Sequence, residues 1–348
     1  MAFDFDFELL QELTETSGAP GYEDRIRDIV RRELDGEVND IHTDAMGNVV
    51  GTIEGSSDYE VAIAAHMDEI GFMVTHVNED GFLSLDSLGG WDPRVLRAQR
   101  VTVHTENEDL TGIIGSMPPH ILDDDDERKV EDVYIDLGLP AEEASERVSA
   151  GDIVTMEQTT TRVGEHVTGK SLDDRICLFT MLEAAKRIED PDVTIHFCAT
   201  VQEEVGLRGA EALGVDIDPD LAIALDVTVA NDIPGVEKKK DYVTSLGDGT
   251  AIKLKDGSVV TTPNVHRRLR SLAEDRDIEH QLEILPSGGT DTAGFQNSYG
   301  AKPVGAISVP TRYLHTVTES AHGDDVSATI DLLTAFLETE TGKHDYSL

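Results

Sequence analysis

Hydrophobic positions follow two different periods along the chain, and each period predicts a different kind of element. Apolar residues recur at helical spacing over 7–13 and again over 22–34, with a turn containing Gly and Pro between them. The segment 60–65 is almost entirely apolar, which predicts a buried strand, and His66 follows it directly. The chain therefore begins with two predicted helices and a predicted buried strand.

A different pattern covers residues 70–164. Short alternating segments separated by frequent turns predict a β-rich domain there. After Gly169 longer elements return, and their mixture of helix and strand is typical of an α/β domain. We expect helices over 174–188, 265–276 and 324–340, and strands over 193–201, 220–225 and 301–309. The α/β part is thus split in sequence by the β-rich insertion.

The charge of the chain is strongly negative. Its 348 residues include 70 acidic and 28 basic ones, a formal net charge of −42, and the acids are spread along the whole sequence. Such self-repulsion destabilises a compact state in dilute buffer. At about 1 M salt the Debye length falls to about 3 Å, so the repulsion is largely screened. The composition therefore predicts a protein of a very salty cytoplasm, and the sign of the charge disfavours binding to nucleic acid.

Two further features concern the compartment. No apolar run is long enough to span a bilayer, and the start of the chain lacks the basic and apolar regions of a signal peptide. Cys177 and Cys198 lie in apolar stretches and make no disulfide framework. We therefore expect a cytoplasmic protein that is not attached to a membrane.

Side chains that can bind metal ions stand at the ends of predicted elements. Divalent ions of the zinc type prefer imidazole nitrogen and carboxylate oxygen, and ligands of α/β sheets gather at the carboxyl ends of strands. One such His or Asp is more often a hydrogen-bonded turn residue, but the repeated pattern favours a metal site. The adjacent Glu203 and Glu204 would also repel each other without a cation. The candidates are His66, Asp68, Asp173, Glu203, Glu204, Asp226 and His315.

The order and spacing of several motifs resemble those of one known family. The chain is similar to the cytosolic co-catalytic zinc aminopeptidases that include the tetrahedral, dodecameric (TET) aminopeptidases, and its acidity would make it a halophilic member. The resemblance runs nearly from end to end. The similar segments are 17–23, 44–48, 65–74, 89–92, 170–175, 202–209, 288–291 and 312–315.

This resemblance implies two divalent metal ions per chain. Zinc is the expected ion, with cobalt or manganese as alternatives. Asp173 would bridge both ions with its two carboxylate oxygens. The other four ligands would be His66 and Asp226 for one ion, and Glu204 and His315 for the other.

The resemblance also implies two catalytic residues that bind no metal. Glu203 would be the general base. Asp68 would orient the imidazole of His66, as a metal-bound histidine requires. Asp174, next to the bridging residue, would have a structural role. A free substrate α-amine can coordinate one ion, which favours removal of N-terminal residues from peptides.

The fold implied by the resemblance is a three-layer α/β/α catalytic domain interrupted by a β-barrel-like domain. The catalytic domain would comprise 1–69 and 165–348. The insertion, 70–164, would make the dimer contact, and the dimers would assemble into a hollow tetrahedral dodecamer with inward-facing active sites. The substrates would then be peptides and unfolded segments with a free N-terminus.

Other readings remain open. A carboxypeptidase or a deacylase of N-acyl amino acids could use the same two-metal site. A glycosidase is disfavoured, because metal binding would occupy the carboxylates of Glu204 and Asp173. An inactive scaffold is disfavoured by the intact Glu203. For His120 and the acidic run 123–127, a solvated loop is favoured over a role in a site.

Overall fold

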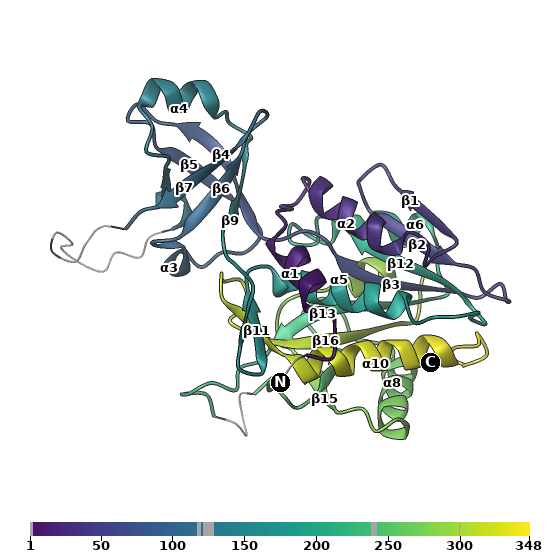
Figure 1. The fold of residues 1–348 in the computed structure, drawn as a ribbon. Helices are drawn as coiled ribbons and strands as arrows, with labels where there is room; N and C mark the ends of the chain where they lie inside the picture. Colours follow the sequence, from purple (N-terminus) through teal and green to yellow (C-terminus); the bar gives the residue numbers. More distant parts are fainter. Residues whose placement is uncertain (1–2, 117–119, 121–128, 238–241, 299) are drawn as a thin grey trace.

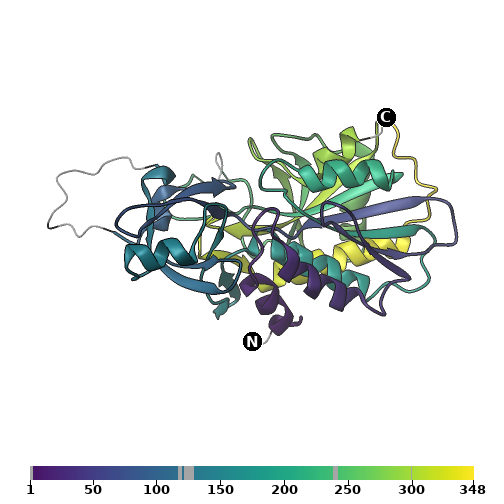
Figure 2. The ribbon, with the colours of Figure 1, turned by 90° about the horizontal axis from the view of Figure 1, so that it is seen from above.

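Two units make up the computed structural model, which describes residues 3–116, 120, 129–237, 242–298 and 300–348. The larger unit is an α/β domain, and the smaller is a β-barrel that stands at one end of it (Figures 1 and 2). None of the helices in these residues is long and apolar enough to cross a membrane.

The larger domain is built on an eleven-stranded sheet. Its strands are β1 (Asp40–Thr43), β2 (Val49–Ile53), β3 (Glu60–His66), β10 (Thr161–Val163), β11 (His166–Gly169), β12 (Thr194–Thr200), β13 (Leu221–Val229), β14 (Thr250–Lys255), β15 (His280–Ile284), β16 (Val304–Arg312) and β17 (Glu319–His322). The order is β1-β2-β12-β3-β13-β16-β17-β11-β10, and β14 joins β16 to β15. The central strands β12, β3, β13 and β16 are parallel. Their carboxyl ends therefore meet at one edge of the sheet.

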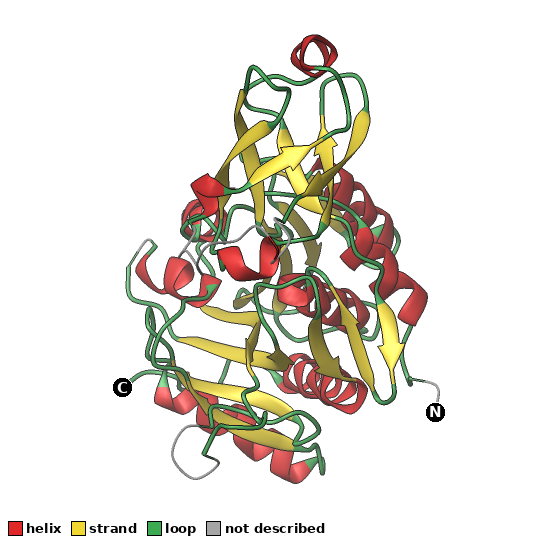
Figure 3. Ribbon diagram, turned by 90° about the vertical axis from the view of Figure 1, so that its left-hand side faces the viewer, coloured by secondary structure: helices red, strands yellow, loops and turns green. Residues whose placement is uncertain are grey.

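Helices cover both faces of this sheet (Figure 3). One face packs against α1 (Phe7–Glu15), α2 (Asp24–Leu34), α5 (Leu172–Ala185), α8 (Pro263–Asp275) and α10 (Gly323–Thr339), and the other against α6 (Arg208–Asp216) and α9 (Asp291–Asn297). Successive residues of β3 alternate between the two cores: Ile63 lies in the first, and Ala62 and Ala64 lie in the second. The expected three-layer α/β/α domain is confirmed.

The long predicted elements are present, with ends that differ by a few residues, whereas several short elements of the α/β domain were not anticipated. Among these are the helices α6 and α9 and the strands β14 and β15, whose sequences contain no long apolar run. The strand β13 also continues past its predicted end to Val229, so that Asp226 lies inside the strand and pairs with Ser308 of β16.

The smaller unit is a closed antiparallel barrel. It contains β4 (Gly71–Val77), β5 (Leu83–Leu88), β6 (Arg100–His104), β7 (Asp109–Ile114), β8 (Tyr134–Asp136) and β9 (Ile153–Met156), in the order β4-β5-β8-β7-β6-β9. The barrel has an apolar core, to which Val317 of the larger domain also belongs, and it carries the short helices α3 (Pro93–Leu96) and α4 (Ala141–Arg147) and the 3₁₀ turn Val130–Asp132. The strand β10 falls within the range expected for the insertion, yet it pairs with β11 in the larger sheet. The barrel strands themselves span 71–156.

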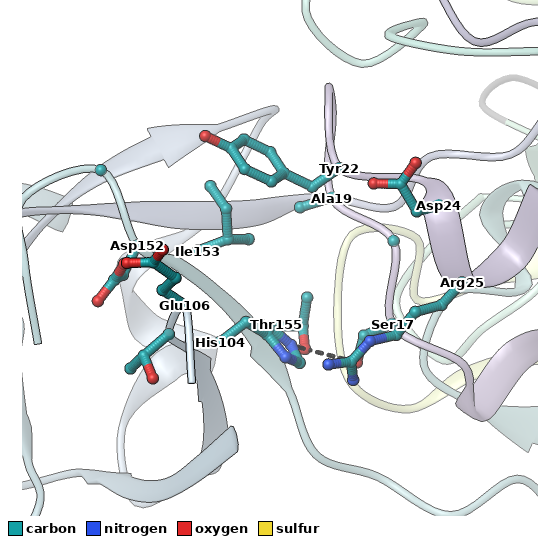
Figure 4. Close-up of a pocket in the computed structure, with 13 residues that line it drawn as sticks. Ser17, Ala19, Tyr22, Asp24, Arg25, His104, Glu106, Asp152, Ile153 and Thr155 are labelled. Carbon is teal, nitrogen blue, oxygen red and sulfur yellow. Dashed lines mark hydrogen bonds between the residues drawn. The ribbon is translucent and has the colours of Figure 1, made fainter. Parts of the chain in front are cut away.

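Polar contacts join the barrel to the α/β domain around a cavity of about 330 Å³ (Figure 4). The hydroxyl of Thr155 lies 3.0 Å from that of Ser17 and 2.9 Å from Nε2 of His104. Arg25 donates two hydrogen bonds, of 2.6 and 2.9 Å, to the carboxylate of Asp109. Because Ser17 and Arg25 belong to the larger domain and the other three residues to the barrel, these contacts fix one unit against the other.

Candidate metal centre

The five predicted metal ligands lie together at the carboxyl edge of the parallel strands. Ligand atoms of His66, Asp173, Asp174 and Asp226 lie within 4.8 Å of one another, and so do those of Asp173, Glu204 and His315. Asp173 belongs to both groups. Its Oδ1 is 3.3 Å from Nε2 of His66, and its Oδ2 is 3.4 Å from Nε2 of His315. The two imidazoles therefore face the two oxygens of one carboxylate.

The chemistry of this donor set fits divalent cations. Asp174 and Asp226 are buried, and burial raises their pKa values well above the ordinary range. Burial also raises the pKa of Glu204 to about 8, and the charge of Asp173 adds to this shift. Ionised carboxylates so close together need positive charge beside them. Two imidazoles and a set of buried carboxylates that share one bridging member match the ligands that zinc-type ions prefer.

Asp174 lies closer to the centre than the sequence suggested. Its side chain is buried, and one of its oxygens falls within the first ligand group. Oδ2 accepts a hydrogen bond from the backbone N–H of His66 at 3.2 Å, and Oδ1 has no hydrogen-bond partner among the described residues. The peptide bond between Asp173 and Asp174 is cis. Asp174 thus contacts the backbone of His66 and also contributes one oxygen to the first ligand group.

Asp68 holds the ends of two strands together. Its carboxylate accepts hydrogen bonds from the backbone N–H groups of Glu203, at 3.0 Å, and Glu204, at 3.1 Å. The backbone carbonyl of Asp68, rather than its carboxylate, lies at hydrogen-bond distance from Nδ1 of His66, at 3.0 Å, while Oδ1 is 3.5 Å away. The residue therefore positions the His66 ring through its main chain and the Glu203–Glu204 turn through its side chain.

Glu203 stands apart from both ligand groups. Its Oε2 is 4.0 Å from Nε2 of His66, and the carboxylate lines a cavity of about 440 Å³ beside the centre. Burial raises its pKa well above the ordinary range. A carboxylate with a raised pKa, next to a site that can activate water but outside the ligand set, has the position that a general base needs.

Glu319, which the sequence did not single out, supports ligands of both groups. It is buried, and its carboxylate accepts hydrogen bonds from the backbone N–H of Asp173, at 3.0 Å, and of His315, at 2.8 Å. One side chain therefore holds the main chain of the bridging residue and of the second imidazole. Its place after His315 gives no sign of this role, because both contacts depend on the pairing of β17 with β11 and β16.

The barrel contributes directly to the centre through the loop after β5. The carbonyl oxygen of Gly90 lies 2.7 Å from Nδ1 of His315, which orients the imidazole with Nε2 toward Asp173. A Cβ atom on Gly90 would lie 3.2 Å from that Nδ1, so a side chain at this position would be in tight contact with the imidazole ring. Trp91 fixes the loop: its indole N–H donates to the carbonyl of Gly71 at 3.1 Å, and its ring stacks on Phe72.

A buried ionic cluster secures the elements beneath the centre. Nζ of Lys170 lies 2.5 Å from Glu69, directly after β3, and both side chains are buried. The buried guanidinium of Arg175 donates to the carbonyls of Met67, at 2.6 Å, and Leu13, at 2.5 Å. These bonds tie the end of β3 to the start of α5 and to α1. The strand carrying His66 and the helix carrying Asp173 are therefore linked directly by buried polar contacts.

Three further histidines lie outside the two ligand groups. His120 is exposed, and the acidic run 123–127 lies outside the described residues. His196 contacts Thr52 and Glu60 on β2 and β3, each at 3.0 Å, so both of its ring nitrogens have partners within the sheet. His322 ends β17 and caps α10 by accepting the N–H of Asp324.

The chain is similar to known aminopeptidases over most of its length. The family model described as M42 glutamyl aminopeptidase matches residues 47–332. The lysyl aminopeptidase of Pyrococcus furiosus is 35% identical over 346 residues, which cover 96% of this chain and 97% of that protein. An aminopeptidase from Desulfurococcus kamchatkensis superimposes with a TM-score of 0.93 at 37% identity, covering 96% of this chain and 94% of its own.

A further solved structure concerns assembly. The TET1 peptidase of Pyrococcus horikoshii, described as able to assemble into a tetrahedron or a large octahedral shell, superimposes with a TM-score of 0.87 at 33% identity. The match covers 96% of this chain and 99% of that one. Family model, relatives and solved structures agree over almost the whole sequence, and the ligand groups around Asp173 suit a metal-dependent hydrolase. The chain therefore belongs to the M42 family of metal-dependent aminopeptidases.

Proposed function

We propose that this enzyme removes N-terminal residues from peptides by means of a water molecule activated by two divalent metal ions. The observation that carries the proposal is the position of Asp173 between two ligand groups, with one imidazole facing each of its oxygens. His66 and Asp226 would complete one site, with an oxygen of Asp174 near it, and Glu204 and His315 would complete the other. Zinc suits these ligands, and cobalt or manganese would also fit them.

The side chains around the centre would have different roles in catalysis. Two divalent ions bound by these residues would lower the pKa of a shared water toward about 7 and polarise the scissile carbonyl. Glu203 would accept the proton of the attacking water and return it to the departing amine. Asp68 holds the turn that carries Glu203, and Glu319 holds the backbone of Asp173 and His315. The free α-amine of a peptide can serve as a further ligand of the centre, which restricts cleavage to the N-terminal bond.

The requirement for a free amine gives the decisive test. With zinc, cobalt or manganese added in molar KCl, the enzyme should cleave the first residue from a peptide and should not cleave the same peptide after acetylation. A chelator should abolish the activity, and added metal should restore it. Equal cleavage of the acetylated peptide would place the enzyme among deacylases or endopeptidases, and release from the C-terminus would identify a carboxypeptidase.

We further propose that the chain works as an oligomer in a salty cytoplasm. The Pyrococcus horikoshii TET1 peptidase is described as able to assemble into a tetrahedron or a large octahedral shell, and in this chain the barrel would provide the dimer contact from which a dodecamer is built. Every subunit of such a particle would bring a formal net charge of −42 to its neighbours.

This charge predicts a strong dependence on salt. At about 0.1 M salt the Debye length is about 10 Å, so like-charged surfaces repel across subunit contacts that molar salt would screen. Dialysis from molar KCl into dilute buffer should dissociate the particle and abolish activity, and bound metal should delay the loss. Light scattering and activity, followed over days, test this. A particle that stays assembled and fully active in dilute buffer would contradict the halophilic interpretation and leave the peptidase assignment intact.

A further inference from the structure

The cavity beside the metal centre has two chemically different sides. One side consists of the centre itself, with Asp173, Glu203, Glu204, Asp226 and His315. The other is formed by the end of β13, the segment after β15 and the residue before His315. Its side chains are those of Val227, Thr228, Val229, Leu285, Ser287 and Leu314, with Gly288 and Gly289 between them.

This second side is uncharged, and its polar side chains are the hydroxyls of Thr228 and Ser287. Val229, Leu285 and Leu314 are each partly exposed and line the cavity with apolar surface, and Leu314 also packs against the larger core. Gly288 has a φ of +96° and, with Gly289, leaves room where larger side chains would fill the space. The lining carries no Lys or Arg among the described residues, and its only carboxylates are those of the metal centre and the base.

The lack of charge on this second side of the cavity determines which substrate side chains can bind there favourably. A substrate bound through its α-amine and scissile carbonyl must place its first side chain near the centre, and this cavity of about 440 Å³ opens there. A Glu side chain would find no cation in the described lining, and a Lys side chain would find no carboxylate other than those engaged at the centre. Burying either charge without a partner is unfavourable, whereas apolar contact with Val229, Leu285 and Leu314 favours an aliphatic chain.

We propose that this cavity binds the N-terminal side chain of the substrate and selects uncharged aliphatic residues such as Leu, Met and Val. The inference rests on the proposed two-metal function and specifies its substrate class. The expected preference differs from those in the names of its relatives. The family model is described as a glutamyl aminopeptidase, and the Pyrococcus furiosus relative is described as a lysyl aminopeptidase. Each of those names refers to a charged residue that the lining described here does not complement.

The proposed preference for aliphatic residues can be tested by introducing a charged residue into the uncharged side of the cavity. The metal-loaded enzyme in molar KCl is assayed with chromogenic amides of Leu, Met, Val, Glu and Lys, and kcat/KM for Leu is expected to exceed that for Glu and Lys by at least about tenfold. Leu285→Lys should raise the Glu/Leu ratio of kcat/KM by about tenfold or more, and Leu285→Asp should do the same for the Lys/Leu ratio. Leu285 belongs to neither ligand group, so metal content should stay unchanged.

The matched control is Leu282→Lys. Leu282 lies on β15, three residues before the wall position, is 42% exposed and does not line the cavity, so the same added charge should leave both ratios unaltered. Preference of the native enzyme for Glu or Lys, or ratios that change equally in both variants, would overturn the proposal. Absence of hydrolysis of every free amino-acid amide, with peptides also uncleaved, would instead overturn the aminopeptidase function on which the inference rests.

Discussion

Glu203→Gln is expected to lower kcat by about 10²–10⁴ while the enzyme keeps both metal ions. The amide has the size of the carboxylate but cannot accept the proton of the attacking water. Glu203 belongs to neither ligand group, and its backbone N–H stays bonded to Asp68 in the variant. Substrate binding should change little, so that KM remains within a few-fold of its original value.

The neighbouring residue provides the control. Glu204→Gln has the same change of charge one position along the chain, but Glu204 lies in the group with Asp173 and His315. This variant should lose the ion held by that group and should recover activity in excess metal. Elemental analysis and kcat, measured for both variants in molar KCl, decide between the roles. Loss of metal in Glu203→Gln and retention in Glu204→Gln would reverse the assignment of the pair.

Glu319→Gln is expected to weaken metal binding by about 10–100-fold, the usual cost of removing a group that orients metal ligands. The carboxylate accepts one N–H from Asp173 and one from His315 on its two oxygens. An amide can accept only one of these bonds and presents its NH₂ group to the other N–H. The backbone of the bridging ligand or of the second imidazole must then move. Excess metal should restore kcat, because Glu319 takes no part in proton transfer.

A second buried carboxylate separates this effect from general destabilisation. Glu340, at the end of α10, is also buried, and its Oε1 accepts the N–H groups of Thr341, at 2.9 Å, and Gly342, at 2.8 Å. Glu340→Gln should lower the thermal midpoint without changing metal affinity. Metal titration and thermal unfolding are measured for both variants. Equal losses of stability with unchanged metal affinity would show that Glu319 is only structural.

The sequence was sufficient to single out the candidate ligands because they follow long apolar runs. His66, Glu204 and Asp173 stand where such a run or turn ends, and the resemblance to a known family favoured Asp173 over the adjacent Asp174 as the predicted bridge. The structure brings these residues together with Asp226 and His315. The position of Asp226 at the end of a strand was not predicted correctly. Asp226 lies inside β13, because pairing with β16 extends the strand beyond its apolar segment.

The supporting groups could not be predicted, since they act through the main chain. Glu319 contacts two backbone N–H groups, and Gly90 contributes a carbonyl that any residue type would carry. Neither contact can be recognised from the residue type or from the hydrophobic period of the sequence. The role of Asp68 was anticipated only in part: its carbonyl faces the imidazole, and its carboxylate holds the glutamate turn instead. Such contacts depend on how the strands pair in the folded domain, and this pairing cannot be derived from a single sequence.

The hydrogen bond between Gly90 and His315 has a consequence for how the enzyme is made. A ribosome releases His66 and the whole barrel first, and the bridging Asp173 and the second imidazole emerge later. A nascent chain that has completed its barrel therefore holds one imidazole and none of the shared carboxylate. The loop that orients His315 is translated long before the residue that it orients. On the proposed mechanism, hydrolytic activity can arise only after both halves of the larger domain have been made and have come together, so an unfinished chain would be inactive.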